Sequence, residues 1–413
     1  MKSKSSDEHF CILPWIHFAI MPSGEVYSCC RSDFVKPLGH FKTQNLNEIW
    51  NGDEFKHLRL EMMQNKKIAA CQDCYNQEKV GHKSLRQISN EEWSDEFPRL
   101  EQTQPDGSLK DNLTPIHLDL RFTNICNFKC RTCGSDFSTS WYSDCQKLGV
   151  KDYQLEFTTS DKKEELWAEL KAYLPSVRRV YFAGGEPLMH DDHYRLLEEL
   201  IKLEHCDVRL TYNTNLSVLS FKKQSVLDLW KHFDDIYICA SLDGIGAQGE
   251  YVRHGLDWNN FKMNRELIKR QFPKIKFNLY WTLSVFNVFH IVDAFKFFIE
   301  ENFIESGLNF EVNILNDPSI YCIKILNQSE REQLKLHYKN FIDNYLMHSQ
   351  FEAKEEFAKI LSYILAYLDE GVFQKERKAF WLYTRQLDRL RGENLLKLFP
   401  ELQNLMLEPL ANE

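Results

Sequence analysis

Hydrophobic and polar residues follow a repeating order along the middle of the chain. Between about residues 114 and 315, runs with the two-residue period of a strand alternate with longer runs whose apolar residues recur at helical spacing. The expected strands are 116–122, 177–183, 208–212, 235–241, 275–285 and 308–315, and the expected helices are 164–174, 194–203, 221–233, 259–271 and 288–301. This alternation is typical of a parallel sheet with helices outside it, whose chemistry lies at the carboxyl ends of the strands.

The two ends of the chain follow other patterns. Near the N-terminus, Pro22-Ser23-Gly24 is a turn signal between short β-like runs, and a helical run over 45–63 follows it. Polar, turn-rich residues then predict a linker, and the last part of the chain is amphipathic and helical. We therefore expect four segments, 1–85, 86–113, 114–320 and 321–413.

Composition narrows the function classes. The 413 residues carry a net charge of −9, which argues against a general nucleic-acid or anionic-membrane surface. The sequence has no apolar run of membrane-spanning length, and its first ten residues lack a signal-peptide core. Twelve cysteines in such a chain favour metal-bound thiols in a reduced, cytoplasmic compartment over a disulfide scaffold.

The strongest chemical signal is the loop that follows the first strand of the repeat. It reads NICNFKCRTCGSD and places Cys126, Cys130 and Cys133 at C-x3-C-x2-C spacing. Thiolates that converge on so short a loop suit zinc or an iron–sulfur cluster. No fourth Cys or His follows within ten residues, so an iron–sulfur cube held here would keep one iron open. A zinc site with a remote fourth ligand is the alternative.

A second cysteine group lies in residues 1–85. Cys11, Cys29, Cys71 and Cys74 form two pairs, and we expect Cys11 and Cys29 to flank a hairpin to which a helix returns the C-x2-C pair. Four thiolates make a closed site that suits either zinc or an iron–sulfur cluster. Cys30 adds a fifth thiol beside Cys29, so either of the two is a candidate ligand.

A glycine-rich turn follows the second strand of the repeat. Gly184-Gly185 would let a ligand approach the backbone closely, and Glu186, before Pro187, could bind an ammonium group.

The C-x3-C-x2-C loop and the GGEP turn together resemble those of the radical S-adenosylmethionine (radical SAM) enzymes. The resemblance implies a partial (β/α)6 barrel and a [4Fe–4S] cluster on Cys126, Cys130 and Cys133. In that family the open iron binds the amino and carboxylate groups of S-adenosylmethionine, and one electron cleaves the sulfonium to a 5′-deoxyadenosyl radical. The GGE motif holds the methionyl amino group.

The N-terminal spacing is similar to the twitch module, the short form of the SPASM extension, which holds an auxiliary [4Fe–4S] cluster. The likeness implies Cys11, Cys29, Cys71 and Cys74 as ligands, since the count from Gly24 favours Cys29 over Cys30. Here the module precedes the barrel instead of following it.

Further strand ends supply candidate cofactor contacts. Asn213, Ser241 and Asp243 carry groups that could hydrogen-bond ribose hydroxyls, and the resemblance implies that Arg253 meets the carboxylate of S-adenosylmethionine. The same residue types are also common turn formers. Many family members have an aromatic residue before the third cysteine, where this chain has Thr132, and Phe128 is a candidate substitute for the adenine contact.

The resemblance implies an enzyme that abstracts a substrate hydrogen and uses the auxiliary cluster for a net oxidation. The first expected substrate is a peptide or protein side chain, and the alternative is a small polyol or aminosugar that is dehydrogenated. A flavodoxin or ferredoxin is the expected electron donor. The non-enzyme alternative is a binding protein stabilised by zinc or an iron–sulfur cluster, which would make the GGEP turn accidental.

Overall fold

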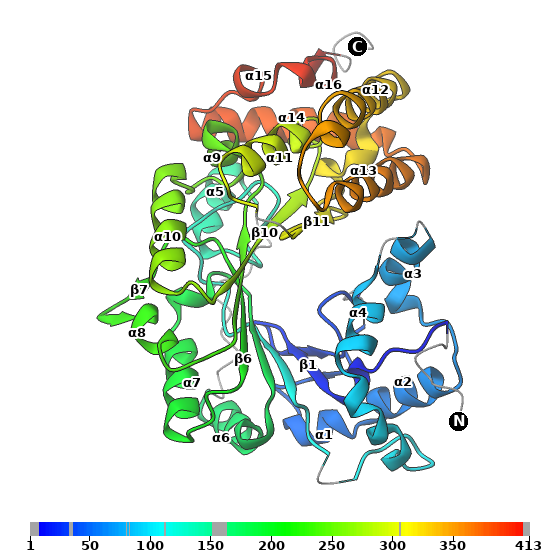
Figure 1. Cartoon of the computed structure of the whole chain (residues 1–413), viewed down its shortest axis with the longest axis vertical. Helices are drawn as coiled ribbons and strands as arrows, with labels where there is room; N and C mark the ends of the chain where they lie inside the picture. The colour runs from blue at the N-terminus through cyan, green and yellow to red at the C-terminus, as the bar shows by residue number, and fades with distance from the viewer. Residues whose placement is uncertain are drawn as a thin grey trace. The chain divides into compact units, whose positions relative to one another are not determined.

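The computed structural model describes residues 8–32, 36–79, 81, 83–110, 113–150, 163–304 and 307–407. The first seven residues, which bear on the signal-peptide expectation, lie outside this range. Within it the chain forms two compact units (Figure 1). The first unit comprises 1–125, 156–213 and 218–237, and the second comprises 126–155, 214–217 and 238–413. The four segments expected from composition stay predictions.

The first unit is built on a mainly parallel sheet. Its strands are β1 (His17–Ile20), β2 (Glu25–Tyr27), β3 (Gly39–His40), β4 (His117–Leu120), β5 (Arg179–Phe182) and β6 (Arg209–Thr214), in the order β6-β5-β4-β1-β2-β3. β4, β5 and β6 run parallel, as the alternation predicted. β1 pairs in parallel with β4, with Ala19 opposite Asp119, and forms the expected hairpin with β2. The N-terminal cysteine module therefore extends the parallel sheet directly.

Helices of the first unit follow the predicted pattern with two differences. They are α1 (Leu46–Trp50), α2 (Asp53–Met63), α3 (Gln72–Lys79), α4 (Leu85–Glu92), α6 (Lys163–Tyr173), α7 (Asp191–Lys202) and α8 (Val226–Trp230). The helix expected over 45–63 is divided by Gly52, which has an extended backbone and lies against the Glu48 carbonyl. The helix expected over 221–233 begins late, because Lys222 has a φ of +53° and turns the chain between β7 (Ser220–Phe221) and β8 (Gln224–Ser225).

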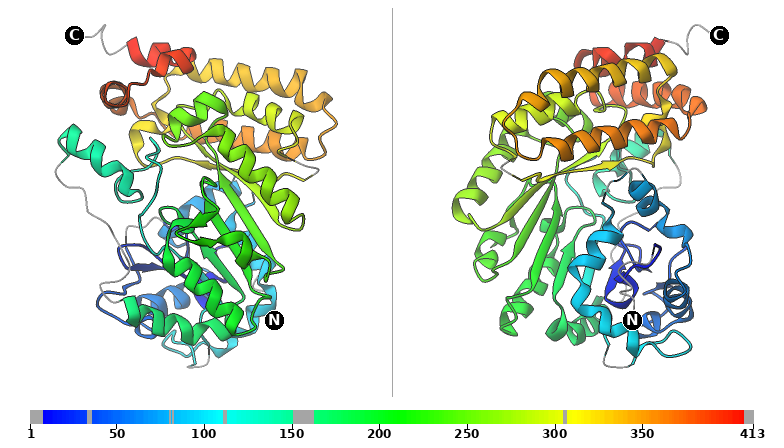
Figure 2. Two further views of the ribbon diagram at one scale, coloured as in Figure 1. Left: turned by 90° about the vertical axis from the view of Figure 1, so that its left-hand side faces the viewer. Right: turned by 45° about the vertical axis from the view of Figure 1, so that its right-hand side comes forward.

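The second unit contains β9 (Ile236–Ser241), β10 (Lys276–Leu283) and β11 (Phe310–Ile314), in the order β11-β10-β9. Alternate residues of β10 are buried, so that one face of this strand faces the core. Its helices are α5 (Tyr142–Leu148), α9 (Gly246–Val252), α10 (Trp258–Gln271), α11 (Ile291–Glu300), α12 (Gln328–Asn344), α13 (Lys354–Asp369), α14 (Gln374–Arg391), α15 (Leu395–Leu398) and α16 (Gln403–Leu407). The predicted C-terminal helical region is confirmed, and α12, α13 and α14 lie side by side in Figures 1 and 2.

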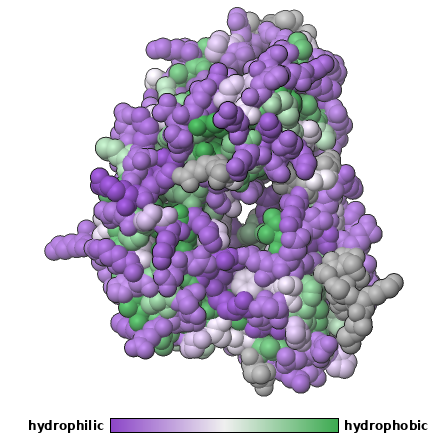
Figure 3. All heavy atoms as spheres, viewed as in Figure 1, coloured by the Kyte–Doolittle hydropathy of each residue, from purple (hydrophilic) through white to green (hydrophobic). Residues whose placement is uncertain are grey.

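Residues 86–113, which the composition predicts as a linker, include regular structure. They hold most of α4 and a 3-10 helix over Ser94–Gln102, and Thr103 pairs with Leu109 around a turn at Gly107. Hydrophilic side chains predominate on the face shown in Figure 3. No helix in the described part of the chain has the length and apolarity that a membrane span requires.

Candidate functional site

The loop that carries Cys126, Cys130 and Cys133 is held through its backbone. The Lys129 amide donates to the His254 carbonyl at 2.9 Å, and the Arg131 amide donates to the Val252 carbonyl at 2.7 Å. Within the loop, the Cys133 amide donates to the Cys130 carbonyl at 3.1 Å. The segment between the second and third cysteines is therefore a fixed turn that lies against the end of α9.

Its three thiols lie within electrostatic reach of one another. A hydrogen bond between the Cys130 and Cys133 thiols lowers the pKa of Cys130 and raises the pKa of Cys133, to which Cys126 adds a further upward contribution. Asn215 Nδ2 lies 3.8 Å from Cys126 Sγ. The loop thus brings together the three thiols that the spacing singled out.

Arg253 is the cation beside these thiols. Burial alone would lower its pKa, but the neighbouring Cys130, Asp243 and Cys133 outweigh burial and raise it. Its Nη1 donates to Asp243 Oδ2 at 2.8 Å, and its buried Nε has no hydrogen-bond partner among the described residues. The other Asp243 oxygen accepts from the Thr282 amide at 2.9 Å. Asp243 is fully buried, and each of its oxygens accepts a hydrogen bond, so its carboxylate holds the Arg253 side chain in place in this structure.

In the first unit, the GGEP turn lies against the chain that leads into Cys126. The Gly185 amide donates to the Thr123 carbonyl at 3.0 Å, and the Glu186 amide donates to the Ile125 carbonyl at 2.7 Å. A Cβ on Gly185 would lie 2.1 Å from the Ile125 oxygen, and Gly184 has a φ of +114°. Both glycines are required at this turn because of close approach and backbone conformation.

The other predicted cofactor contacts differ in their surroundings. Asn213, near the end of β6, has a buried Oδ1 that finds no hydrogen-bond partner within the described part of the chain, so this oxygen is available to a ligand hydroxyl. Ser241 is half-buried at the end of β9. Phe128 is buried and lies against Gly255, so its side chain has little exposed surface, and its role as an adenine contact stays a prediction.

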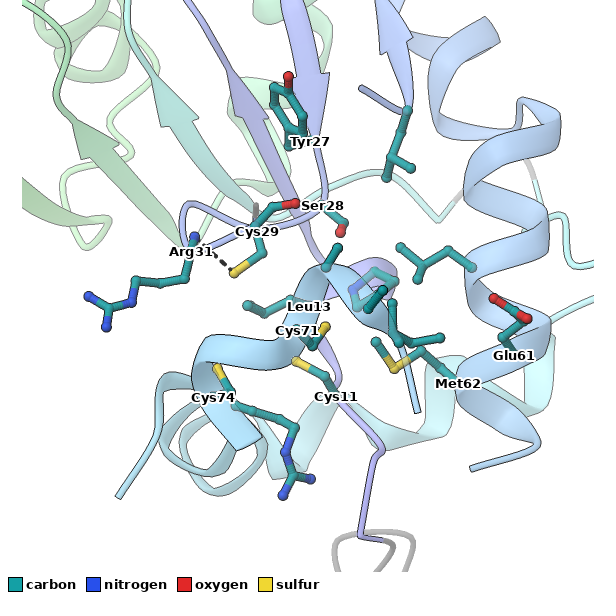
Figure 4. A pocket seen from close by; sticks show the side chains of 18 of the residues that line it. Cys11, Leu13, Tyr27, Ser28, Cys29, Arg31, Glu61, Met62, Cys71 and Cys74 are labelled. Carbon is teal, nitrogen blue, oxygen red and sulfur yellow. Dashed lines mark hydrogen bonds between the residues drawn. The ribbon is translucent and has the colours of Figure 1, made fainter. Parts of the chain in front are cut away.

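The N-terminal cysteines surround a cavity of about 350 Å3 in the first unit (Figure 4). Cys11, Cys29, Cys71 and Cys74 all line it, and Figure 4 shows their sulfur atoms around one space. Burial raises the pKa of Cys11, and Cys71 adds to this effect. Cys71 ends a 3-10 helix and Cys74 lies in α3, so this pair comes from one helical turn.

The neighbouring thiols of Cys29 and Cys30 have different surroundings. Cys29 lies near Cys11 and Cys74, whereas the neighbours of Cys30 include Asp119 and Arg121. The cavity lining contains Cys29 and lacks Cys30. The arrangement favours Cys29 as the fourth member of the group, in agreement with the spacing from Gly24.

Helix α4 fixes the chain on both sides of Cys11. Asn90 Nδ2 donates to the Phe10 carbonyl at 2.9 Å, and Asn90 Oδ1 accepts from the Ile12 amide at 2.9 Å. Arg86 Nη1 also donates to the Phe10 carbonyl, at 2.8 Å. The position of this thiol therefore depends on a helix about 75–80 residues further along the chain.

The donor sets suit iron–sulfur clusters. A cluster of four irons and four sulfides occupies more space than one ion, and the N-terminal group of four thiols encloses a cavity of about 350 Å3. The loop of three thiols supplies one ligand fewer than a closed cluster needs.

Several groups around the cysteines could not be assigned to them from the sequence. Asn215 belongs to the Asn-Thr-Asn run at the end of β6, whose amide groups suggested ribose contacts, but its place beside Cys126 could not be predicted. The charged partners of the cysteine loop, Asp388 and Glu393, are more than 250 residues distant, and no local pattern indicates them.

Comparison with known proteins gives two family matches. Residues 11–75 match the SPASM iron–sulfur cluster-binding domain, and residues 120–298 match the radical SAM superfamily. Both matches agree with the resemblance drawn from the motifs.

The individual proteins that the chain resembles share a quarter or less of its residues in the matched regions. A GTP 3′,8-cyclase of Staphylococcus carnosus (strain TM300) is 25% identical over 225 residues, which are 52% of this chain and 59% of that protein. Among solved structures, anSMEcpe with bound AdoMet and Cp18Cys peptide is 19% identical, with a TM-score of 0.38 over 59% of this chain and 61% of that chain. Streptococcus suis SuiB bound to precursor peptide SuiA is 15% identical, with a TM-score of 0.38 over 80% of this chain and 69% of that chain. The chain thus spans about three fifths of the length of the cyclase and of anSMEcpe.

Proposed function

We propose that this chain, whose residues 120–298 match the radical SAM superfamily, is an enzyme that cleaves S-adenosylmethionine and oxidises an organic substrate. [4Fe–4S] clusters and S-adenosylmethionine are the cofactors of its two matched domains. The observation that carries the proposal is the presence of two clusters of cysteines. One cluster has three thiols on a single loop, and the other has four thiols around one cavity.

Cys126, Cys130 and Cys133 would hold the first cluster. When bound, this cluster supplies the electron that splits the sulfonium of S-adenosylmethionine and yields a 5′-deoxyadenosyl radical. The hydrogen bond from Asn215 toward Cys126 and the guanidinium of Arg253 beside Cys130 would stabilise negative charge on the thiolates. The chain's own contribution is thus to fix three thiolates and to place positive groups near them.

S-adenosylmethionine would be oriented by the GGEP turn and by the polar groups at strand ends. In this proposal Glu186 binds the methionyl ammonium, and the unpartnered Asn213 Oδ1 accepts a hydrogen bond from a ribose hydroxyl. Arg253 meets the carboxylate through its unpartnered Nε, and Ser241 is a further ribose contact. Asp243, which the sequence predicts as a ribose contact, is better suited to hold Arg253.

Cys11, Cys29, Cys71 and Cys74 would hold the auxiliary cluster. Its chemistry when bound is to accept the electron that a substrate radical loses, which makes the net reaction an oxidation. Arg31 and Arg86, which line the same cavity, would offset the negative charge of four thiolates. We also propose a reducing, cytoplasmic environment, because twelve cysteines in this chain suit metal-bound thiols better than a disulfide scaffold, and a flavodoxin or ferredoxin as electron donor.

A peptide or protein side chain is the substrate that we propose first, because many radical SAM enzymes with this type of module act on peptides. The match to GTP 3′,8-cyclase, a protein named for a nucleotide substrate, favours a small molecule as the second candidate. In that case we propose dehydrogenation of a polyol or aminosugar. Isotopically labelled candidate substrates, tested for label transfer into 5′-deoxyadenosine, would separate the two.

The test of the proposal is iron, sulfide and 5′-deoxyadenosine in anaerobically reconstituted protein. Wild type should hold about eight irons, and the Cys126/Cys130/Cys133 triple Ala variant about four and no 5′-deoxyadenosine activity. Cys206→Ala removes a thiol outside both groups and is the matched control. Retention of 5′-deoxyadenosine formation in the triple variant would contradict the proposal, and about four irons with zinc in wild type would end the oxidative part of it.

A further inference from the structure

The last long helix of the chain lies against the cysteine loop. Arg131, between Cys130 and Cys133, has a fully buried side chain whose Nη2 lies 2.6 Å from Asp388 Oδ1 in α14 and also contacts Glu393, two residues past that helix. Its guanidinium lies 3.8 Å from the centroid of the Tyr251 ring. The Tyr251 hydroxyl donates to the same Asp388 oxygen at 2.8 Å. A single buried cation of the loop is thus held from α9 and α14 together.

A second set of charges joins α5 to both sides of this contact. Asp144 in α5 is buried and accepts from Lys129 of the cysteine loop at 2.7 Å and from Arg391, the last residue of α14, at 2.9 Å. Trp141 donates to the Cys130 carbonyl at 3.1 Å, and the Arg391 guanidinium lies 4.6 Å from its ring centroid. Trp141 and Leu387 belong to one buried apolar cluster.

These contacts balance in charge. The three cations Lys129, Arg131 and Arg391 face the three carboxylates Asp144, Asp388 and Glu393, and His254 also contacts Glu393. Because the Arg131 and Arg391 side chains are almost wholly buried, loss of one partner would leave a charge that water cannot reach. A loop that carries such charges can keep one position only while α14 supplies their partners.

We propose that Asp388 and Glu393 are positioning residues for the first cluster, so that α14 is part of the cluster site and not a separable extension. They act through Arg131, whose place in the chain beside Cys130 fixes the turn from Cys130 to Cys133. The inference rests on the proposed function of this loop as a cluster site. It assigns to the C-terminal region a role in presenting the thiols.

The experiment compares Asp388→Asn with Glu330→Gln. Glu330 forms an equally buried ion pair with Arg377, also in α14, at 2.7 Å, so its variant reports general loss of stability. Both variants should lower the thermal midpoint. Only Asp388→Asn should lose iron from the first cluster to a chelator several-fold faster than wild type. Its reduced cluster should also give a different spectrum from that of wild type after S-adenosylmethionine is added. To isolate the first cluster, both substitutions are made in protein whose N-terminal cysteines are Ala.

The outcomes separate this inference from the proposed function. Equal effects of the two variants on the cluster, or no effect of Asp388→Asn, would overturn it. If wild type held no iron on this loop, the proposed function would fail, but alkylation of Cys130 in metal-free protein would still test the contact, with several-fold faster reaction expected for Asp388→Asn. If Asp388→Asn does not fold, Glu393→Gln, which removes the other carboxylate that contacts Arg131, takes its place in each comparison.

Discussion

At the scale of single residues, the two adjacent thiols of Cys29 and Cys30 are distinguished by their neighbours. Cys29 lines the N-terminal cavity with the other three cysteines, whereas Cys30 lies beside Asp119 and Arg121. From the sequence, only the spacing from Gly24 indicated which of the two cysteines is the ligand. The alternation of side chains at the end of a short strand does not determine which of two neighbouring residues points inward.

We predict that Cys29→Ala and Cys30→Ala differ in iron content. Loss of a ligand should remove the auxiliary cluster from Cys29→Ala and halve its iron, from about eight to about four per chain. Cys30→Ala should keep the wild-type value, and each variant is the control for the other. Iron analysis of reconstituted protein tests this prediction. If both variants kept the wild-type value of about eight irons, either thiol could serve as the ligand.

The second prediction at this scale concerns Gly185. An added Cβ would lie 2.1 Å from the Ile125 carbonyl oxygen, so the GGEP turn must move away from the chain that precedes Cys126. We expect Gly185→Ala to bind S-adenosylmethionine at least about tenfold more weakly, as measured by calorimetry on reconstituted protein. Gly134→Ala, in the cysteine loop but with open space around its Cα, should bind as wild type does. Equal affinities would mean that the turn does not contribute to binding.

At the scale of elements, α4 contributes more than the polar composition of residues 86–113 suggested. Its Asn90 hydrogen-bonds the backbone on both sides of Cys11, and such bridging side chains cannot be recognised without knowledge of which helix returns to which strand. The helices and strands of the repeat were predictable, because their hydrophobic period is a local property. The break at Gly52 and the late start of α8 were missed, since single residues with special backbone geometry decided them.

We therefore predict that Asn90→Leu weakens the auxiliary site. The substitution leaves the buried Ile12 amide without its acceptor, at an expected cost of about 1–3 kcal/mol, and frees the Cys11 segment. Iron of the auxiliary cluster should be lost faster to a chelator and the thermal midpoint should fall. Asn90→Asp, which keeps an acceptor for Ile12, should lie between wild type and Asn90→Leu. Ile88→Ala, on the exposed face of the same helix, should behave as wild type. An unchanged rate of iron loss in Asn90→Leu would contradict this account.

At the scale of the whole molecule, the two cysteine groups could be predicted from sequence, but the distant residues that hold them in place could not. C-x3-C-x2-C and GGEP are short motifs, so residues that are close together in the chain are enough to indicate their chemistry. Arg131 and Asp388 are 257 residues apart, and nothing near either residue indicates the other. Long-range ion pairs depend on how the chain returns through space, and only the structure supplies that.

Buried histidines make the whole first unit sensitive to acid. Burial lowers the pKa of His17 to about 4 and that of His193 to about 3, below the value of about 6.5 in an unfolded chain. Because the unfolded state binds protons more readily below about pH 6.5, stability should be complete above that pH and should fall as the pH drops toward 4. The expected loss is about 2 kcal/mol for each of the two histidines at pH 5.

The corresponding measurement is the thermal midpoint of metal-free protein between pH 7.5 and pH 5. His193 lies among Phe182, Tyr194 and Tyr212, so His193→Phe keeps the aromatic contacts and removes one titrating group. Its midpoint should fall less steeply with acidification than that of wild type, although loss of the hydrogen bond to Tyr212 lowers the value at pH 7.5. The exposed His348→Phe is the control and should follow the wild-type slope. If His193→Phe also followed that slope, protonation of this histidine would not contribute to acid unfolding, and the sensitivity would have to arise from other groups.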